Sequence, residues 1–350
     1  MSIKEIAKLA GVSPGTVDRV IHKRGNVSQK SREAVESVLN KVGYTPNLHL
    51  SSISMKRNYK ITIVIPAYKQ GDYWSQIVEG FTQAVQSYSN INIECEYIEF
   101  DQYDIFSCRK AFSQVIPQRP NAVIIGAIFK DESFLLASQL ETKSIPYIYV
   151  DSYVFGTNPV AYFTVHHHSC GILIARLLDQ ITPQGGDIAL FQAIRVGDES
   201  ANNTIMRKVG FLDYLNGEQV ERILHNIPFS PTSISYNVER LKETFAKYPN
   251  IKGAAVLSSR GGIISRSLKE ANINSIKLIC LDLTNDNRAA LSTGDIDFVL
   301  CQRPIEQGSL AIKSLMLYML FGQVGAVENL MPLDIITREN LKFYRERGDL

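Results

Sequence analysis

Residues 2–21, SIKEIAKLAGVSPGTVDRVI, contain two short helical patterns separated by one turn, and this spacing decides the fold of the N-terminal part of the chain. Ser2 and Glu5 have the spacing of a capping box at the start of the first helix. The apolar stripe of that helix comprises Ile3, Ile6, Ala7 and Leu9. Gly11 then breaks the pattern, where the chain must turn.

A second helix is predicted after Ser13, which can cap it, with Pro14 at the first position, where a missing amide hydrogen costs nothing. Its core-facing side chains are Val17, Val20 and Ile21. A third helix is predicted from about Ser28 to a stop at Gly43. Two short helices with a supporting third are the arrangement of a helix-turn-helix, and the alternative is a small three-helix bundle that packs against another structure.

The charge of the chain is distributed unevenly between this head and the rest. Residues 1–60 hold eleven Lys and Arg against four Asp and Glu, so their formal charge is +7. The remaining residues carry a formal charge of −5, and the whole chain has +2. A basic head on a mildly acidic body indicates that the head meets a polyanion, the alternative being a solvated basic surface.

The sequence of residues 2–47 closely resembles the DNA-binding head of the lactose-repressor (LacI) family. The stretches that carry the resemblance are IKEIAKLAGVSPGTVDRVI and GNVSQKSREAVESVLNKVGYTPN. The resemblance implies binding to double-stranded operator DNA, with the second helix in the major groove. The side chains that would then face the DNA lie opposite the core face and comprise Pro14, Gly15, Thr16, Asp18, Arg19 and His22.

Each of these positions predicts a different contribution to DNA recognition. Arg19 is the candidate for direct readout, because its planar fork can pair with O6 and N7 of guanine. By resemblance, Thr16 contacts a phosphate or a thymine methyl group. Asp18 replaces the family's usual Ser, and it either orients Arg19 or accepts from a cytosine amino group. Pro14 and Gly15 stand where many relatives place specificity side chains, and neither can donate a side-chain hydrogen bond.

The segment after the head, NLHLSSISMKRN, is rich in Ser but also carries apolar side chains. The resemblance implies a hinge helix here, with Ile53 at the position of the family's intercalating leucine. Such an apolar wedge unstacks a base step in the minor groove and kinks the duplex. The family's preceding arginine is Ser51 in this chain. A plain linker is the alternative interpretation.

From residue 60 onward, short β-branched runs alternate with segments of helix length. The predicted strands are 61–66, 91–100, 122–128, 145–151, 187–193, 253–259, 277–283 and 298–302. Near-continuous apolar strands separated by helices predict doubly wound parallel sheets. The expected fold is therefore an all-α helix-turn-helix head followed by an α/β body of two doubly wound parallel-sheet lobes.

The body resembles the effector domain of the same family, which is akin to periplasmic sugar-binding proteins. We expect a head at 1–46, a hinge helix or linker at 47–59, an effector-binding body at 60–343 and a tail at 344–350. Within the body, each expected lobe is made of two separate segments of the chain. Lobe 1 comprises about 60–163 and 298–323, and lobe 2 comprises about 164–297 and 324–343.

In doubly wound sheets, ligands lie beyond the carboxyl ends of the strands. The polar side chains at these ends, with the chain's only tryptophan, predict a site for a polar ring such as a sugar. By resemblance, Tyr73 and Trp74 stack on the ligand. The residues that would bind its hydroxyl groups are Asp151, Arg207, Asp282 and Gln302. Each of these residues taken singly also has a purely structural alternative. Trp74 could be a core residue, Asp151 and Asp282 could be helix caps, and Arg207 could be a surface cation.

The run VHHHSCG at 165–171 stands where relatives usually carry an Asp-Asn pair before a helix. Three consecutive histidines do not readily converge on one metal ion, because adjacent residues of a strand point to opposite faces. We therefore expect no metal and no cofactor. His166 is assigned to the ligand site, at the cleft or the boundary between the lobes.

Several functional classes are disfavoured by the sequence. It contains no P-loop, GxGxxG, HExxH, CxxC or GxSxG motif, so we expect a binding protein and not an enzyme. The odd, scattered set of cysteines predicts reduced thiols in a cytoplasm: Cys95, Cys108, Cys170, Cys280 and Cys301. The sequence shows neither a signal peptide nor an apolar run long enough to span a bilayer, so we expect no membrane contact.

These observations predict a transcriptional regulator, expected to be a repressor, whose operator affinity is controlled by a small sugar-like effector. A homodimer would place two heads on a pseudo-palindromic site. Release of DNA and tighter binding both remain open as the response to ligand, since family members do both. The alternatives are a solute receptor for a transporter and a sugar-acting enzyme with the same body fold.

Overall fold

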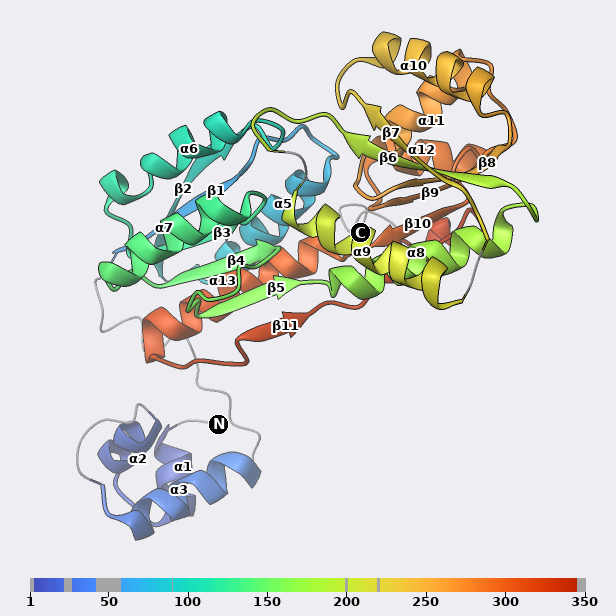
Figure 1. The fold of residues 1–350 in the computed structure, drawn as a ribbon. Helices are drawn as coiled ribbons and strands as arrows, with labels where there is room; N and C mark the ends of the chain where they lie inside the picture. The colour runs from blue at the N-terminus through green and yellow to red at the C-terminus, as the bar shows by residue number, and fades with distance from the viewer. Residues whose placement is uncertain are drawn as a thin grey trace.

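The computed structural model describes residues 3–21, 27–41, 58–89, 91–198, 201–218 and 221–344. Figure 1 shows a small helical head and a larger body of two α/β lobes. The predicted fold class is confirmed, because each lobe is built on a six-stranded, mostly parallel sheet. Among the described residues, no helix is both long and apolar enough to cross a membrane.

In its described residues, the head has three helices around a small apolar core. Their bounds are α1 (Ile3–Ala10), α2 (Pro14–Ile21) and α3 (Gln29–Lys41). Its buried side chains are Ile6, Ala7, Val17 and Val35. As predicted, Ser13 caps α2, since its Oγ accepts from the Thr16 N–H at 3.1 Å. Leu9 was expected in the apolar stripe, but it is 60% exposed because it lies outside the face that Ile6 and Ala7 bury.

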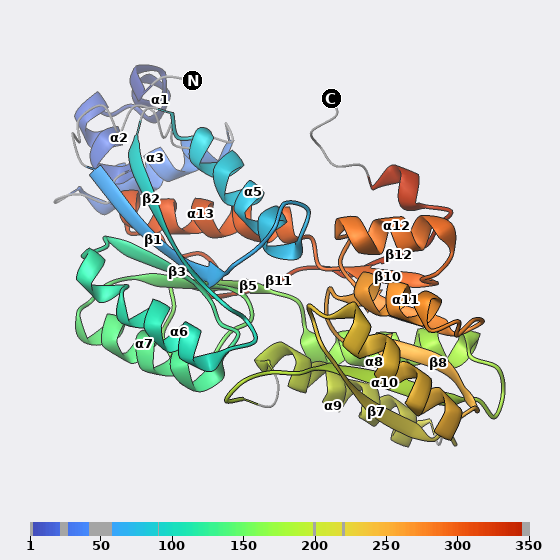
Figure 2. The same ribbon diagram turned by 90° about the horizontal axis from the view of Figure 1, so that it is seen from above.

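The sheet of lobe 1 has the strand order β11-β5-β4-β3-β1-β2, and all its pairings are parallel. Its strands are β1 (Asn58–Pro66), β2 (Asn92–Phe100), β3 (Ala122–Gly126), β4 (Tyr147–Asp151), β5 (Ala161–Thr164) and β11 (Glu328–Leu330). Two helices cover each face (Figure 2). One face carries α5 (Tyr73–Gln86) and α13 (Pro304–Phe321), and the other carries α6 (Ile105–Ser113) and α7 (Lys130–Thr142). A 3-10 turn, η1 (Ile116–Gln118), follows α6.

The sheet of lobe 2 has the order β12-β10-β9-β8-β6-β7, with only the β10–β12 pair antiparallel. Its strands are β6 (Asp187–Ala193), β7 (Leu224–Phe229), β8 (Ile251–Val256), β9 (Lys277–Leu281), β10 (Phe298–Cys301) and β12 (Asp334–Ile336). Two separate apolar clusters cover its two faces. One involves α8 (His167–Ile181) and α9 (Asn202–Gly217), and the other involves α10 (Ile234–Lys247), α11 (Gly261–Glu270) and α12 (Asn285–Thr293). The turn η2 (Leu341–Phe343) comes last.

The chain crosses between the lobes three times: between β5 and α8, between β10 and α13, and between β11 and β12. This differs from the expected boundaries at residues 298 and 324. Strand β10 belongs to lobe 2 because it pairs with β9, and the crossing comes only at α13, which packs on α5. Strand β11 belongs to lobe 1 because it pairs with β5.

Glycines bring one pair of helices into close contact in each lobe. A Cβ atom on Gly80 of α5 would lie 2.0 Å from the Ile305 carbonyl oxygen of α13, and one on Gly308 would lie 2.1 Å from that of Ile77. In lobe 2, Gly171 of α8 and Gly210 of α9 face each other's helix in the same way. These close crossings fix α5 and α9, which carry side chains of the site described below.

Candidate ligand site and candidate nucleic-acid interface

Two aspartates occupy corresponding strand ends in the two lobes. Asp151 is the last residue of β4 and Asp282 directly follows β9, and each is only 2% exposed. Both adopt a left-handed backbone, with φ of 69° and 62°. A non-glycine residue in this region costs about 1–3 kcal/mol, and such strain gathers at functional sites. The two strand ends therefore mark the space between the lobes as a candidate site.

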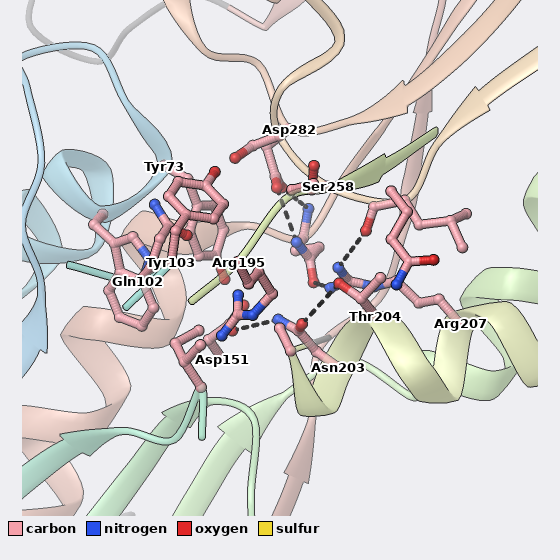
Figure 3. Close-up of a pocket in the computed structure, with 18 of the residues that line it drawn as sticks. Tyr73, Gln102, Tyr103, Asp151, Arg195, Asn203, Thr204, Arg207, Ser258 and Asp282 are labelled. Atoms are coloured by element: carbon pink, nitrogen blue, oxygen red, sulfur yellow. Dashed lines mark hydrogen bonds between the residues drawn. The ribbon is translucent and has the colours of Figure 1, made fainter. Parts of the chain in front are cut away.

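Two residues of α9, Arg207 and Asn203, bind these strand ends, Arg207 through Gln302 and Asn203 directly. Arg207 of α9 donates from Nη2 to Oε1 of Gln302 at 2.7 Å and from Nη1 to the carbonyl oxygen of Leu257 at 3.0 Å. Gln302 in turn donates from Nε2 to Oδ2 of Asp282 at 2.9 Å. From the same helix, Asn203 donates to Oδ2 of Asp151 at 2.7 Å, across the two lobes (Figure 3).

Two aromatic side chains begin α5 at the opposite side of the site. The Tyr73 and Trp74 rings lie edge to face with centroids 5.5 Å apart, and both side chains are almost fully buried. Trp74 can lie this close to the sheet because residue 126 is glycine: a Cβ there would come within 2.8 Å of the ring. Aromatic faces beside carboxylates, amides and a guanidinium suit a ring with apolar faces and polar edges.

Burial dominates the electrostatics of the two aspartates. It raises the pKa of the Asp282 carboxyl to about 7, although Arg207 and Gln302 act in the opposite direction. Burial raises the pKa of Asp151 as well, opposed chiefly by Arg207. Near neutral pH the Asp282 carboxyl can therefore donate or accept a hydrogen bond, and a ligand hydroxyl can match either state.

Six of the seven residues expected to bind the ligand line one cavity of about 60 Å³: Tyr73, Trp74, Asp151, Arg207, Asp282 and Gln302. The sequence interpretation missed six further polar lining residues: Gln102, Tyr103, Gln192, Arg195, Asn203 and Thr204. Gln102 and Tyr103 come directly after β2, and Arg195 comes just after β6. The rule that ligands lie beyond the carboxyl ends of strands could have found these three residues.

The histidine run has a different role from the one expected. His166, predicted in the ligand site, does not line the cavity: it is exposed and caps α8, with Nδ1 accepting from the Ser169 N–H. His167 is buried 2.8 Å from the Asp151 carbonyl oxygen, and burial lowers its pKa well below the usual value. His168 lies 2.7 Å from Asp213. In the part of the chain that the structure describes, no group of three His, Cys, Asp or Glu could hold a metal ion.

Backbone hydrogen bonds close the two lobes around the cavity. The Asn285 N–H of lobe 2 donates to the Gly71 carbonyl oxygen of lobe 1 at 3.1 Å. A second pair of hydrogen bonds joins Val196 of lobe 2 to the loop after β2 in lobe 1. The Val196 N–H donates to the Tyr103 carbonyl oxygen at 2.7 Å, and the Ile105 N–H donates to the Val196 carbonyl oxygen at 3.2 Å. The structure is therefore a closed form, in which a bound molecule would contact both lobes.

The candidate DNA-binding residues on α2 lie on its outer side. Val17 is buried in the head, whereas Gly15 and Arg19 are exposed and Thr16 and Asp18 are half-buried. This is the side that would face a major groove. The other two predicted DNA-contacting residues, His22 and Ile53, lie outside the described residues, as do residues 47–57 of the predicted hinge 47–59. The last two residues of that predicted segment, Asn58 and Tyr59, belong to strand β1.

A three-helix head followed by a two-lobed α/β body with a polar cavity between the lobes defines a periplasmic-binding-protein-like class of protein. The profile of the periplasmic binding protein domain matches residues 61–323, and that of the bacterial regulatory proteins of the lacI family matches residues 2–47. The chain belongs to the periplasmic binding protein domain family, and its head belongs to the lacI family of bacterial regulatory proteins.

Individual relatives agree with this assignment. The transcriptional regulator DegA of Bacillus subtilis is 27% identical over 146 residues, which are 41% of this chain and 42% of DegA. The ribose operon repressor of Halalkalibacterium halodurans is 24% identical over 78% of this chain and 75% of its own length. A crystal structure from Bacteroides fragilis, assigned to the LacI transcriptional regulators, is 27% identical with a TM-score of 0.78. That match covers 83% of this chain and 100% of the crystallised one.

Proposed function

We propose that this chain is a DNA-binding transcriptional repressor whose operator affinity is controlled by a small carbohydrate or sugar derivative held between its lobes. The observation that carries this proposal is the closed cavity with two aspartates, one arginine and two aromatic rings, in a body that follows a lacI-family head. The similarity of the chain to the transcriptional regulator DegA and to the ribose operon repressor supports this proposal. The protein acts in the cytoplasm, where its DNA is, and it binds its ligand without converting it.

The lining residues explain how one small molecule can control the angle between the lobes. Asp151 and Trp74 belong to lobe 1, whereas Arg207 and Asp282 belong to lobe 2. A ligand that contacts both sets binds the closed form better than an open one, and this differential affinity shifts the equilibrium. In a dimer on a pseudo-palindromic operator, the shift changes the spacing of the two heads. Coupling of this kind amounts to about 5–150-fold in affinity.

Replacing Trp74 with alanine should abolish the response of DNA binding to the sugar while leaving DNA affinity without sugar within about twofold of wild type. The apolar face on which the sugar stacks is lost, but the head is unchanged. A gel-shift titration with and without the sugar measures both quantities. Trp74→Phe keeps an aromatic face, so it should retain part of the response. An undiminished response in Trp74→Ala would remove this residue from the site.

Replacing Arg19 with alanine should flatten the preference among operator variants at one base pair, which corresponds to about 1–3 kcal/mol of lost discrimination. The reason is the loss of the planar fork that reads guanine. Competition binding with operators that differ at single positions measures the effect. Arg32→Ala removes an exposed cation from α3 and should preserve the wild-type preferences. Equal discrimination by Arg19→Ala and wild type would refute direct readout by Arg19.

A further inference from the structure

Arg195 is a second arginine of the cavity, and it comes from the loop after β6. Figure 3 shows its side chain among those of Tyr103, Asp151 and Asn203. Its guanidinium lies over the Phe129 ring, with Cζ 4.6 Å from the ring centroid, and 6.0 Å from that of Tyr103. Both aromatic residues belong to lobe 1, so the guanidinium of this lobe 2 residue contacts the other lobe across the closed interface.

This guanidinium has hydrogen-bond donors without acceptors. Its Nε and Nη2 atoms are both buried, and neither has a hydrogen-bond partner in the described part of the chain. Nε of Arg207 is likewise buried and has no hydrogen-bond partner among the described residues. The contact with Phe129 satisfies neither of these Arg195 donors, so both remain for another molecule. Buried donors of this kind favour a ligand that brings acceptor oxygens.

The acidic side chains of the cavity already have partners. Asp151 accepts from Asn203, and Asp282 accepts from Gln302. Asp101 and Asp198 also act on Arg195 electrostatically, and they partly oppose the lowering of its pKa by burial. Among the described residues, the donors that lack an acceptor are therefore Nε and Nη2 of Arg195 and Nε of Arg207. A planar donor fork fits carboxylate or phosphate oxygens two at a time.

Arg195 also stands at the edge of the cavity. A second, larger cavity of about 530 Å³ shares three wall residues with the inner one: Gln192, Ala193 and Arg195. The inner cavity, at about 60 Å³, is smaller than the roughly 300 Å³ at the lower end of small-molecule sites. A ligand seated on Trp74 and the two aspartates would therefore extend past Arg195 toward the larger cavity.

We propose that Arg195 determines ligand specificity and that the effector is a sugar bearing an acidic group, a carboxylate or a phosphate, which the Arg195 fork binds. The sugar ring lies between Trp74 and the two aspartates, and its acidic end lies against the Arg195 guanidinium. This inference rests on the proposed function, since it takes the cavity to be the sugar site.

Calorimetric titration of the full chain with matched sugars tests the proposal. The neutral sugars are D-galactose, D-glucose and D-ribose, and their acidic counterparts are D-galacturonate, D-glucuronate, D-glucose 6-phosphate and D-ribose 5-phosphate. At least one acidic sugar should bind at least tenfold more tightly than its neutral parent. Arg195→Gln should weaken binding of that sugar by about 10–100-fold without changing binding of the parent. Comparison of the uronates with the sugar phosphates shows whether the acidic group is a carboxylate or a phosphate.

Two further variants separate recognition from charge and folding. Arg240→Gln removes the same charge from the exposed face of α10 and should bind the acidic sugar as wild type does. Arg195→Lys keeps the charge but lacks the fork, so its affinity should lie between those of wild type and Arg195→Gln. The thermal midpoint of each ligand-free variant, expected at the wild-type value, confirms folding.

Three outcomes would overturn the proposal: a neutral parent that binds as tightly as its acid, unchanged binding of the acid by Arg195→Gln, or no binding of any acidic sugar in the panel. These outcomes are distinct from failure of the proposed function. A chain that binds a neutral sugar and changes its DNA affinity in response overturns the role of Arg195 alone. A chain that binds no DNA fails as a regulator, whichever sugar it prefers.

Discussion

Replacing Arg207 with methionine should abolish sugar binding and lower the thermal midpoint of the body by about 6–15 °C. Arg207 is 2% exposed, and it is the cation that opposes the effect of burial on both Asp151 and Asp282. Without it, the buried carboxylates lose their compensating charge, and Gln302 and the Leu257 carbonyl lose a donor. Removing one partner from a buried charged network costs about 3–5 kcal/mol.

The loss of stability in Arg207→Met should grow as the pH rises from 6 to 8. Asp282 has a folded-state pKa of about 7 against its ordinary 3.8, so the folded state binds a proton more readily than the unfolded state. That contribution favours folding at low pH and is lost as the pH rises through about 7. Methionine raises this pKa further, since Arg207 lowers it, and the penalty for ionising Asp282 in the variant is then largest at pH 8.

Arg222→Met is the matched control, because Arg222 is also a largely buried arginine of lobe 2 but lies away from the cavity. It donates to Asp179 and to the carbonyl oxygens of Thr182, Pro183 and Gly186. This variant should lose stability and still bind sugar once folded. Differential scanning calorimetry and a sugar titration measure the two quantities. Sugar affinity of Arg207→Met within tenfold of wild type would show that Arg207 does not bind the ligand.

Replacing Gly210 with alanine should destabilise the body by about 3 kcal/mol or more and also weaken sugar binding. A Cβ at this position would lie 1.9 Å from the His168 carbonyl oxygen, and the neighbouring contacts are also backbone atoms of α8. Backbone cannot rotate away as a side chain can, so α9 must move. Because α9 carries Asn203 and Arg207, the movement displaces two residues of the cavity.

Gly217→Ala is the control in the same helix. No heavy atom lies within 4 Å of a Cβ built at Gly217, and alanine favours a helix by about 1 kcal/mol over glycine. This variant should therefore keep or raise the thermal midpoint and bind sugar normally. Equal midpoints for Gly210→Ala and Gly217→Ala would contradict the close crossing of α8 and α9.

Four strands were not predicted from the sequence: β5, β7, β11 and β12. β11 (ENL) and β12 (DII) have three residues each, too few to show a periodic pattern. β7 carries Pro228, which disfavours a central strand but is tolerated at the sheet edge that β7 occupies. The crossings at β10 and β11 depend on strand pairing, which is a non-local property.

The site residues also divide into those that the local sequence predicts and those whose position depends on distant parts of the chain. Asp151 and Asp282 could be predicted because their strands are long and apolar, and ligands lie beyond such strand ends. Arg195 sits in a short polar stretch that is typical of a surface turn, and its burial depends on Phe129 and Tyr103 of the other lobe. His166 was predicted in the ligand site because the histidine run stands where relatives carry an Asp-Asn pair before a helix, but in the structure His166 caps α8.

The most direct test of the account is the affinity of the full chain for an operator, measured by fluorescence anisotropy with and without a saturating sugar. The DNA is a genomic fragment selected by the protein itself, and the sugar is one that raises the thermal midpoint of the chain. We expect the dissociation constant to change by about 5–150-fold on adding the sugar, and to stay constant in Trp74→Ala. Identical affinities with and without the sugar, or no binding to any fragment, would contradict the account.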